Sequence, residues 1–175
     1  MTIDPAPVSL LAQRYGIPPT ILFAIIQVES GWRADLARFE PGYRWLWDAR
    51  HGKPYTVPES FVNSVRAPDD FKGILPESDD SEWILQRISF GPAQVLGSTS
   101  RWLGYREPLL NLASWTDGVE YGCKYLDYLR NRHVQGHGWA GVVAAYNAGS
   151  PRYVDDETFV NQEYVHKVLE AGAIF

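Results

Sequence analysis

The chain has 175 residues, of which 45% are hydrophobic, and it carries a formal net charge of −5. This length and apolar content suit one globular domain and are too small for two domains of ordinary size. The acidic balance and the absence of a Lys/Arg cluster argue against a nucleic-acid partner. The longest apolar run, Ile21 to Ile26, is far shorter than the roughly 20 residues of a membrane span.

The N-terminal part of the sequence predicts two helices. The first covers about residues 8–15 and ends at Gly16. Pro18 and Pro19 then open a second helix over about residues 19–30, because proline is tolerated in a first helical turn. Since its apolar residues surround the whole helix, we expect this second helix to be the central one.

The composition changes after the second helix: prolines and aromatic residues recur between Arg33 and about Ile88. This pattern predicts a loop-rich insertion at about residues 34–88 that holds short helices or a small hairpin. The acidic stretch "ESDDSE" within it is expected to be a solvated loop.

Helical signals return after Gly91. Ser98 or Ser100 is expected to cap a short helix through Leu103, and Ser114 caps a longer helix over about residues 115–133. Cys123 lies in the apolar pattern of this helix and is predicted to be a buried, inert thiol. Gly118 and Gly122 predict that a neighbouring backbone packs close to the helix. Two final helices are expected over about residues 139–147 and 159–171.

One carboxyl, that of Glu29, stands at the C-terminal end of the predicted central helix, in "AIIQVESGW". Burial and the negative end of the helix dipole both favour the neutral acid, so we expect its pKa to be raised. A carboxylic acid that stays protonated near neutral pH can protonate a leaving oxygen. The alternative interpretation is an ordinary solvated glutamate at a helix end.

Two further motifs favour the chemical interpretation. "SFGPAQV" follows the insertion at residues 89–95, and "VVAAYNAGS" ends a later helix at residues 142–150. With the Glu-Ser pair they resemble, in order, the three motifs of the soluble lytic transglycosylases: Glu-Ser, Gly-x-x-Gln and Ala-x-Ala-Tyr-Asn-Ala-Gly. The resemblance covers most of the chain outside the insertion. Pro92-Ala93 departs from the usual Leu-Met, and the insertion is longer than usual.

The resemblance implies a mostly α, lysozyme-like fold of the goose-type lysozyme kind, as a single domain over residues 1–175. It implies an enzyme that cleaves the bond between N-acetylmuramic acid and N-acetylglucosamine in peptidoglycan, a lyase reaction that leaves a 1,6-anhydro end. In such a reaction one glutamate, here Glu29, acts first as acid and then as base. The substrate's acetamido group replaces the second carboxylate of most glycosidases.

The resemblance also assigns supporting residues. Tyr146 matches a tyrosine whose hydroxyl bonds the catalytic carboxyl, and Gln94 and Asn147 match polar positions that face the sugar. Ser30 matches the serine after the acid, although its hydroxyl can equally bond a free helix carbonyl. Tyr164 matches the closing tyrosine of the family, with a core aromatic as the alternative.

Three other interpretations stay open. Glu40, or less favourably Asp35, provides a second carboxylate for a hydrolytic muramidase if it faces the same site. A non-catalytic glycan-binding or structural module would keep the fold without the activity. The insertion aromatics Trp45, Trp47 and Tyr55 form either a platform for sugar rings or a small local core.

We expect no metal and no other cofactor. His133 and His137 have the spacing of two zinc ligands, but Gly136 and Gly138 predict that the helix has already ended there.

The expected partners are peptidoglycan glycan strands, and the chain is expected to be a monomer. The N-terminal stretch "MTIDPAPVSLLAQ" lacks the cationic start and long apolar centre of an export signal. Because the substrate lies in the periplasm or outside the cell, we expect delivery by a phage virion, a secretion machinery or lysis. Excision of the domain from a longer exported precursor is the alternative.

Overall fold

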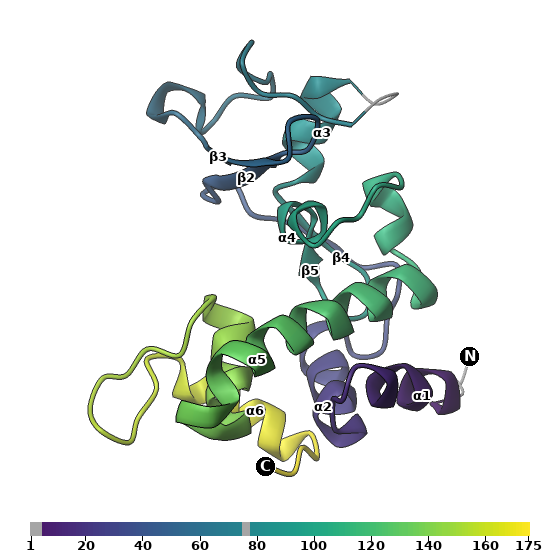
Figure 1. Ribbon diagram of the computed structural model, residues 1–175, viewed down its shortest axis with the longest axis vertical. Helices are drawn as coiled ribbons and strands as arrows, with labels where there is room; N and C mark the ends of the chain where they lie inside the picture. The colour runs from purple at the N-terminus through teal and green to yellow at the C-terminus, as the bar shows by residue number, and fades with distance from the viewer. Residues whose placement is uncertain (1–4, 75–77) are drawn as a thin grey trace. The chain divides into compact units, whose positions relative to one another are not determined.

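The computed structural model of the chain describes residues 5–74 and 78–175 (Figure 1). Pro76 and Glu77 of the predicted insertion lie outside these residues. Helices make up about half of the chain and the sheets are small and antiparallel, so the fold is mixed α and β with helices predominating. The chain forms two compact units: unit 1, which contains Met1–Trp32 and Gly122–Phe175, and unit 2, which contains Arg33–Tyr121.

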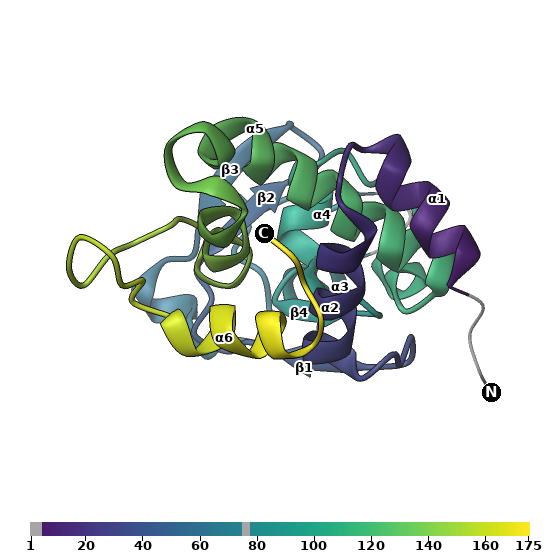
Figure 2. The ribbon, with the colours of Figure 1, turned by 90° about the horizontal axis from the view of Figure 1, so that it is seen from below.

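Unit 1 is built around helix α2 (Pro19–Ser30), which has the predicted bounds. It packs against α1 (Ala6–Arg14) and α6 (Gln162–Glu170), as Figures 1 and 2 show. Its apolar run is buried almost all round, so the predicted central position is confirmed. The helix ends at Gly31, whose left-handed backbone (φ 57°) lets its N–H bond the Gln27 carbonyl.

The long helix α5 (Trp115–Ala148) is broken at Gly138, where φ is 59° and ψ is −168°. The break matches the predicted start of the next helix at about residue 139, but not the predicted end of the first helix at about residue 133. The expectation that the first helix ends before His137 was wrong, because one glycine at position 136 costs only about 1 kcal/mol relative to alanine. His133 and His137 therefore lie one turn apart on one helix, with ring centroids 6.2 Å apart.

Unit 2 contains two antiparallel sheets, and both involve the insertion. Strands β1 (Ala37–Phe39), β4 (Ile88–Phe90) and β5 (Val95–Leu96) form one sheet in the order β1-β4-β5, so the two ends of the insertion pair with each other. Strands β2 (Trp45–Asp48) and β3 (Lys53–Thr56) form a hairpin, with Leu46 opposite Tyr55. The insertion thus holds both a hairpin and short helices, η1 (Glu59–Phe61) and α3 (Asp79–Leu85).

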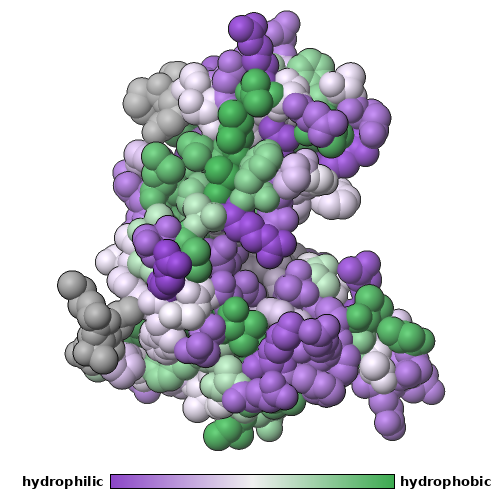
Figure 3. All heavy atoms as spheres, turned by 180° about the vertical axis from the view of Figure 1, so that it is seen from behind, coloured by the Kyte–Doolittle hydropathy of each residue, from purple (hydrophilic) through white to green (hydrophobic). Residues whose placement is uncertain are grey.

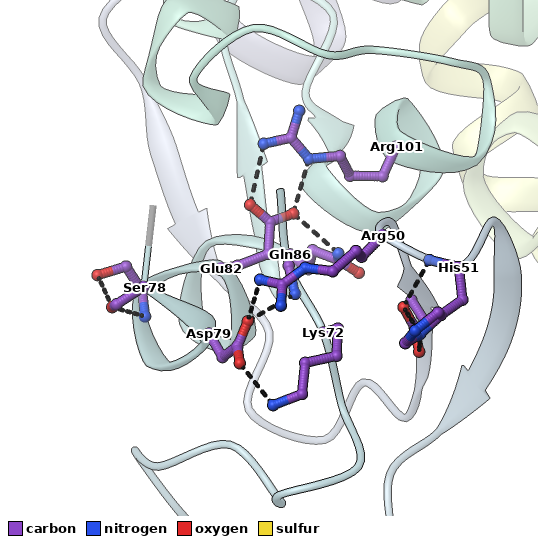
Figure 4. A network of polar contacts seen from close by, with 11 residues as sticks. Arg50, His51, Lys72, Ser78, Asp79, Glu82, Gln86 and Arg101 are labelled. Carbon is purple, nitrogen blue, oxygen red and sulfur yellow. Dashed lines mark hydrogen bonds and ion pairs between the residues drawn. The ribbon is translucent and has the colours of Figure 1, made fainter. Parts of the chain in front are cut away.

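The expectation of a solvated loop was wrong for residues 79–82 of the acidic stretch, because these residues begin helix α3; Glu77 lies outside the described residues. The Ser78 side chain accepts the N–H of Ser81 at 3.0 Å and caps this helix. Glu82 is fully buried, and its carboxylate accepts two bonds from Arg101, at 2.6 and 2.9 Å (Figure 4). Acidic residues in a first helical turn favour the helix, and a buried guanidinium compensates the one carboxylate that faces inward.

The short helix α4 (Gly97–Trp102) begins earlier than expected, with Leu96 at its N-cap and no side-chain cap. Ser98 and Ser100 lie inside it, so the expectation that one of them caps it was wrong. By contrast, Ser114 accepts the N–H of Asp117 at 3.1 Å, which confirms its capping role at the start of α5. Helix η2 (Leu109–Leu112) precedes this cap.

Close backbone approach explains Gly118. A Cβ atom there would lie 2.5 Å from the Leu112 carbonyl oxygen and 2.6 Å from Cδ of Pro92. The predicted packing of a neighbouring backbone is therefore confirmed at this position. The thiol of Cys123 is buried, as predicted.

Hydrophilic side chains cover most of the face in Figure 3, where hydrophobic ones form separate groups. Within residues 5–74 and 78–175, no helix combines the length and apolar character needed to cross a membrane.

The buried Glu82–Arg101 pair generates a stability prediction. Glu82→Gln keeps the side-chain shape but leaves the Arg101 guanidinium without a compensating charge, so the free energy of unfolding should fall by about 3–5 kcal/mol in urea titrations. Glu163→Gln is the control, because it breaks the Lys167–Glu163 pair, whose side chains are 56% and 83% exposed. Equal, small losses for the two variants would contradict the prediction.

Candidate functional site

Glu29 lies in the last turn of α2, and its side chain is half-buried. The chain turns sharply directly after it, because both Gly31 and Trp32 have positive φ angles, 57° and 63°. The Trp32 ring then packs on Phe23, with centroids 5.6 Å apart. The turn thus follows the carboxyl at the helix end, and the half-buried side chain of Glu29 is inconsistent with a fully solvated glutamate.

The hydroxyl of Tyr164 donates a hydrogen bond of 2.6 Å to Oε1 of Glu29. Tyr164 lies in the first turn of α6, which packs against α2, so helix packing brings the two residues together. A core aromatic was the alternative interpretation of this position. Tyr164 is largely enclosed, and its hydroxyl also contacts the candidate acid.

Tyr146, near the end of α5, is a second phenol close to Glu29. It is 8% exposed, and its ring lies 5.2 Å from that of Tyr125. Burial, and then the negative charge of Glu29, raise the pKa of both Tyr146 and Tyr164 well above the ordinary value. Both phenols are therefore neutral hydrogen-bond donors over the physiological pH range. The hydrogen bond that the resemblance implies between Tyr146 and Glu29 stays a prediction.

Ser30 and Asn147 flank this group in the sequence. The Ser30 hydroxyl is buried and bonds the Ile26 carbonyl at 3.0 Å, which is the helix-end interaction weighed for it. Asn147 is exposed, and its Oδ1 accepts a bond of 3.0 Å from Nδ2 of Asn161. Nδ2 of Asn161 also donates to the Ala144 carbonyl at 3.0 Å. Asn161 therefore connects the start of α6 to the end of α5, which contains both Ala144 and Asn147.

Gln94 belongs to unit 2, where residues 91–94 form the turn between β4 and β5. Its backbone has a positive φ of 48°, and its Nε2 donates to the carbonyls of Gly91 at 2.8 Å and Leu36 at 3.3 Å. A Cβ atom at Gly91 would lie 2.1 Å from the Leu112 carbonyl oxygen, so this turn requires glycine. The Gly-x-x-Gln motif is therefore a tightly constrained turn.

The alternative carboxylates, Glu40 and Asp35, also belong to unit 2, and each forms an ion pair with an arginine. Oε1 of Glu40 lies 2.9 Å from Nε of Arg38, and Oδ2 of Asp35 lies 3.2 Å from Nη2 of Arg33. The hydrogen bond from Arg33, followed by its charge, lowers the pKa of Asp35. Both carboxylates are thus engaged with partners near in sequence.

His133 and His137 form no metal site with a third ligand. Over residues 5–74 and 78–175, no three His, Cys, Asp or Glu side chains gather as metal ligands would. Nδ1 of His137 instead lies 2.9 Å from the hydroxyl of Tyr153.

Two residues of this region were missed in the sequence. Asn161 stands just before α6, where asparagine commonly marks a helix start, and that signal was available. Tyr125 lies in the stretch "GCKYL", residues 122–126 of α5. Its contact with Tyr146 depends on how the two segments of α5 pack across the break at Gly138.

The raised phenol pKa values generate a prediction for alkaline pH. Folded Tyr146 and Tyr164 stay protonated above about pH 10, where an unfolded tyrosine ionises. Their contribution to stability is therefore fully present below pH 10 and is lost as the pH rises toward their folded-state values. Tyrosinate absorbance should show a late phase that coincides with loss of far-ultraviolet circular dichroism. One early transition of all ten tyrosines, with the helical signal intact, would contradict this.

Comparisons with protein-family models, curated proteins and solved structures found no match.

Proposed function

We propose that this chain is a peptidoglycan lytic transglycosylase with a lysozyme-like fold, and that Glu29 is its single catalytic acid and base. The observation that carries the proposal is the 2.6 Å hydrogen bond from Tyr164 to the half-buried Glu29 carboxyl. It is supported by the ordered Glu-Ser, Gly-x-x-Gln and Tyr-Asn motifs. The substrate is the β-1,4 bond between N-acetylmuramic acid and N-acetylglucosamine.

The first step requires a neutral carboxyl. Glu29 donates its proton to the glycosidic oxygen, and the bond from that oxygen to the muramoyl anomeric carbon breaks. Two features favour the neutral form: partial burial, which disfavours charge, and a position at the negative end of α2.

The second step requires the carboxylate. Glu29 accepts the proton of the muramoyl 6-hydroxyl while that oxygen bonds to the anomeric carbon, which closes the 1,6-anhydro ring and restores the acid. The Tyr164 phenol supports this step because a hydrogen bond donated to a carboxylate stabilises its charged form. Burial and the phenol thus have opposite effects, and together they bring the two protonation states of Glu29 closer in free energy.

Hydrolysis is the second candidate reaction, since an inverting enzyme needs another carboxylate to activate a water. Arg33 lowers the pKa of Asp35 and so makes it a weaker base, which favours transglycosylation over hydrolysis through Asp35. The Glu40 carboxylate is engaged in an ion pair with Arg38.

Product analysis tests the reaction and the residue together. The wild-type chain should release muropeptides with anhydro ends, which are lighter by one water than hydrolysed ones, and Glu29→Gln should slow their release at least about 100-fold. Glu170→Gln, on the exposed end of α6, is the control that should keep full activity. Reducing ends throughout would establish hydrolysis, and an active Glu29→Gln would remove Glu29 from the mechanism.

Tyr164→Phe tests the second step. Loss of a hydrogen bond to a charged group costs about 1.5–3 kcal/mol, so the turnover rate should fall about 10- to 100-fold. Because the ionised form of Glu29 loses its donor, the decline of activity with rising pH should move to higher pH. Tyr153→Phe removes an exposed phenol that bonds His137 and should change neither quantity. An unshifted profile in Tyr164→Phe would show that the bond is only structural.

A further inference from the structure

A pocket of about 220 Å³ lies within unit 2, between the β2–β3 hairpin and helix α4. Its aromatic walls come from both elements and from the segment before β2. They comprise Tyr43, Trp45, Trp47 and Trp102.

The two tryptophans of β2 face away from the core of the hairpin. Leu46 and Asp48 are buried, whereas Trp45 and Trp47 occupy the alternate positions, and Trp45 is 66% exposed. The core of the insertion is built by other residues, including Phe71 and Trp83. Trp45 is not a single exposed indole, because it lines the pocket together with Tyr43, Trp47 and Trp102, and such contiguous groups are typical of binding surfaces.

The surroundings of Tyr55 differ from those of the two tryptophans. Its ring packs edge-on against Phe71 and Trp83, and its hydroxyl donates to Asp70 at 2.8 Å. The two interpretations of the insertion aromatics therefore divide: Tyr55 belongs to the local core, and Trp45 and Trp47 line the pocket.

A polar group without a partner lies in the wall of the pocket. Ser98 lines the pocket and is 3% exposed, and its hydroxyl has no hydrogen-bond partner among the described residues. Because the oxygen itself is fully buried, this hydroxyl is a cost to the fold and not a contact for a ligand. The hydroxyl of Ser100, also on α4, likewise has no partner among the described residues, but Ser100 does not line the pocket.

A buried polar network holds the two walls in place (Figure 4). The amide of Gln86 bonds both the N–H and the C=O of Trp47, at 2.8 and 2.7 Å, and donates to Glu82 at 2.9 Å. Glu82 in turn pairs with Arg101 of α4. The hairpin wall and the helix wall are thus joined through fully buried side chains, so the pocket is preorganised.

From these features we infer that the pocket binds one neutral pyranose ring of a glycan. The C–H face of the sugar packs on the indoles of Trp45 and Trp102. No lining side chain is charged, which disfavours an anionic sugar. The volume lies below the about 300–1,000 Å³ of pockets for drug-sized ligands, as expected for a single ring.

The identity of the sugar rests on the proposed function. In peptidoglycan, N-acetylglucosamine is neutral and N-acetylmuramic acid carries a lactyl carboxylate. The pocket therefore selects N-acetylglucosamine.

The test measures binding of tri-N-acetylchitotriose to the Glu29→Gln chain. Nuclear magnetic resonance follows the indole N–H signals, which are assigned with single Trp→Phe variants. The signals of Trp45 and Trp102 should shift on binding, and Trp45→Ala or Trp102→Ala should weaken binding about tenfold or more. Binding that leaves both signals in place would overturn the inference.

Ser98→Ala and Ser100→Ala provide a matched pair. Both remove a buried hydroxyl without a partner from α4, so their effects on stability should be alike. Neither variant should weaken binding of the trisaccharide, because both oxygens are fully buried, so the pair serves as the control for the tryptophan variants. Tighter binding of N-acetylmuramic acid than of N-acetylglucosamine would overturn the inferred preference for a neutral sugar. A peptide that shifts the Trp45 and Trp102 signals more strongly than the sugar would make the pocket a peptide site.

Failure of this inference is distinguishable from failure of the proposed function. Binding is measured without turnover, whereas the proposed function is tested by the products of the wild-type chain. Trisaccharide binding at Trp45 in a chain that releases no anhydro ends would leave the pocket as a sugar site of a non-catalytic module.

Discussion

The packing of α6 on α2 is the constraint on which the candidate site of unit 1 depends, because it joins Tyr164 to Glu29 across 135 positions of the chain. Val165 and Val168 are the buried residues of α6. The hydrogen bond between Tyr164 and Glu29 also requires α2 to end at Gly31, so that the carboxyl stands in the last turn. Packing of apolar side chains thus sets the position of the one group to which we assign proton transfer.

In unit 2 a different constraint dominates, the pairing of the buried charged and amide side chains. Glu82, Gln86 and Arg101 are all buried, and each has partners at hydrogen-bond distance. A buried ion pair stabilises a fold only weakly against an apolar replacement, yet losing one partner is costly. Such a network therefore fixes which surfaces of α3, α4 and the hairpin meet. We assign to it the geometry of the tryptophan pocket.

The errors made from the sequence have a common physical cause. The stretch "ESDDSE" was expected to be solvated, because isolated acids seldom lie inside a protein, but Arg101, 19 residues after Glu82, supplies the compensating charge. Ser98 and Ser100 were expected to cap a helix because local bonding of serine is common, yet both lie within α4. In each case a partner distant in sequence, or the packing around the residue, outweighed the local preference.

The sequence by itself determined the bounds of α2, the turn at Gly31 and the placement of Glu29 at a helix end, because periodicity and glycine act over a few neighbouring residues. It also indicated, through a resemblance, Tyr146 as a partner of Glu29 and Tyr164 as a site residue. Only the tertiary structure decided that Tyr164 donates to the carboxyl, that Tyr55 faces the core while Trp45 does not, and that Ser98 lacks a partner. These outcomes depend on contacts between segments far apart in the chain, and local sequence patterns carry no distances across such gaps.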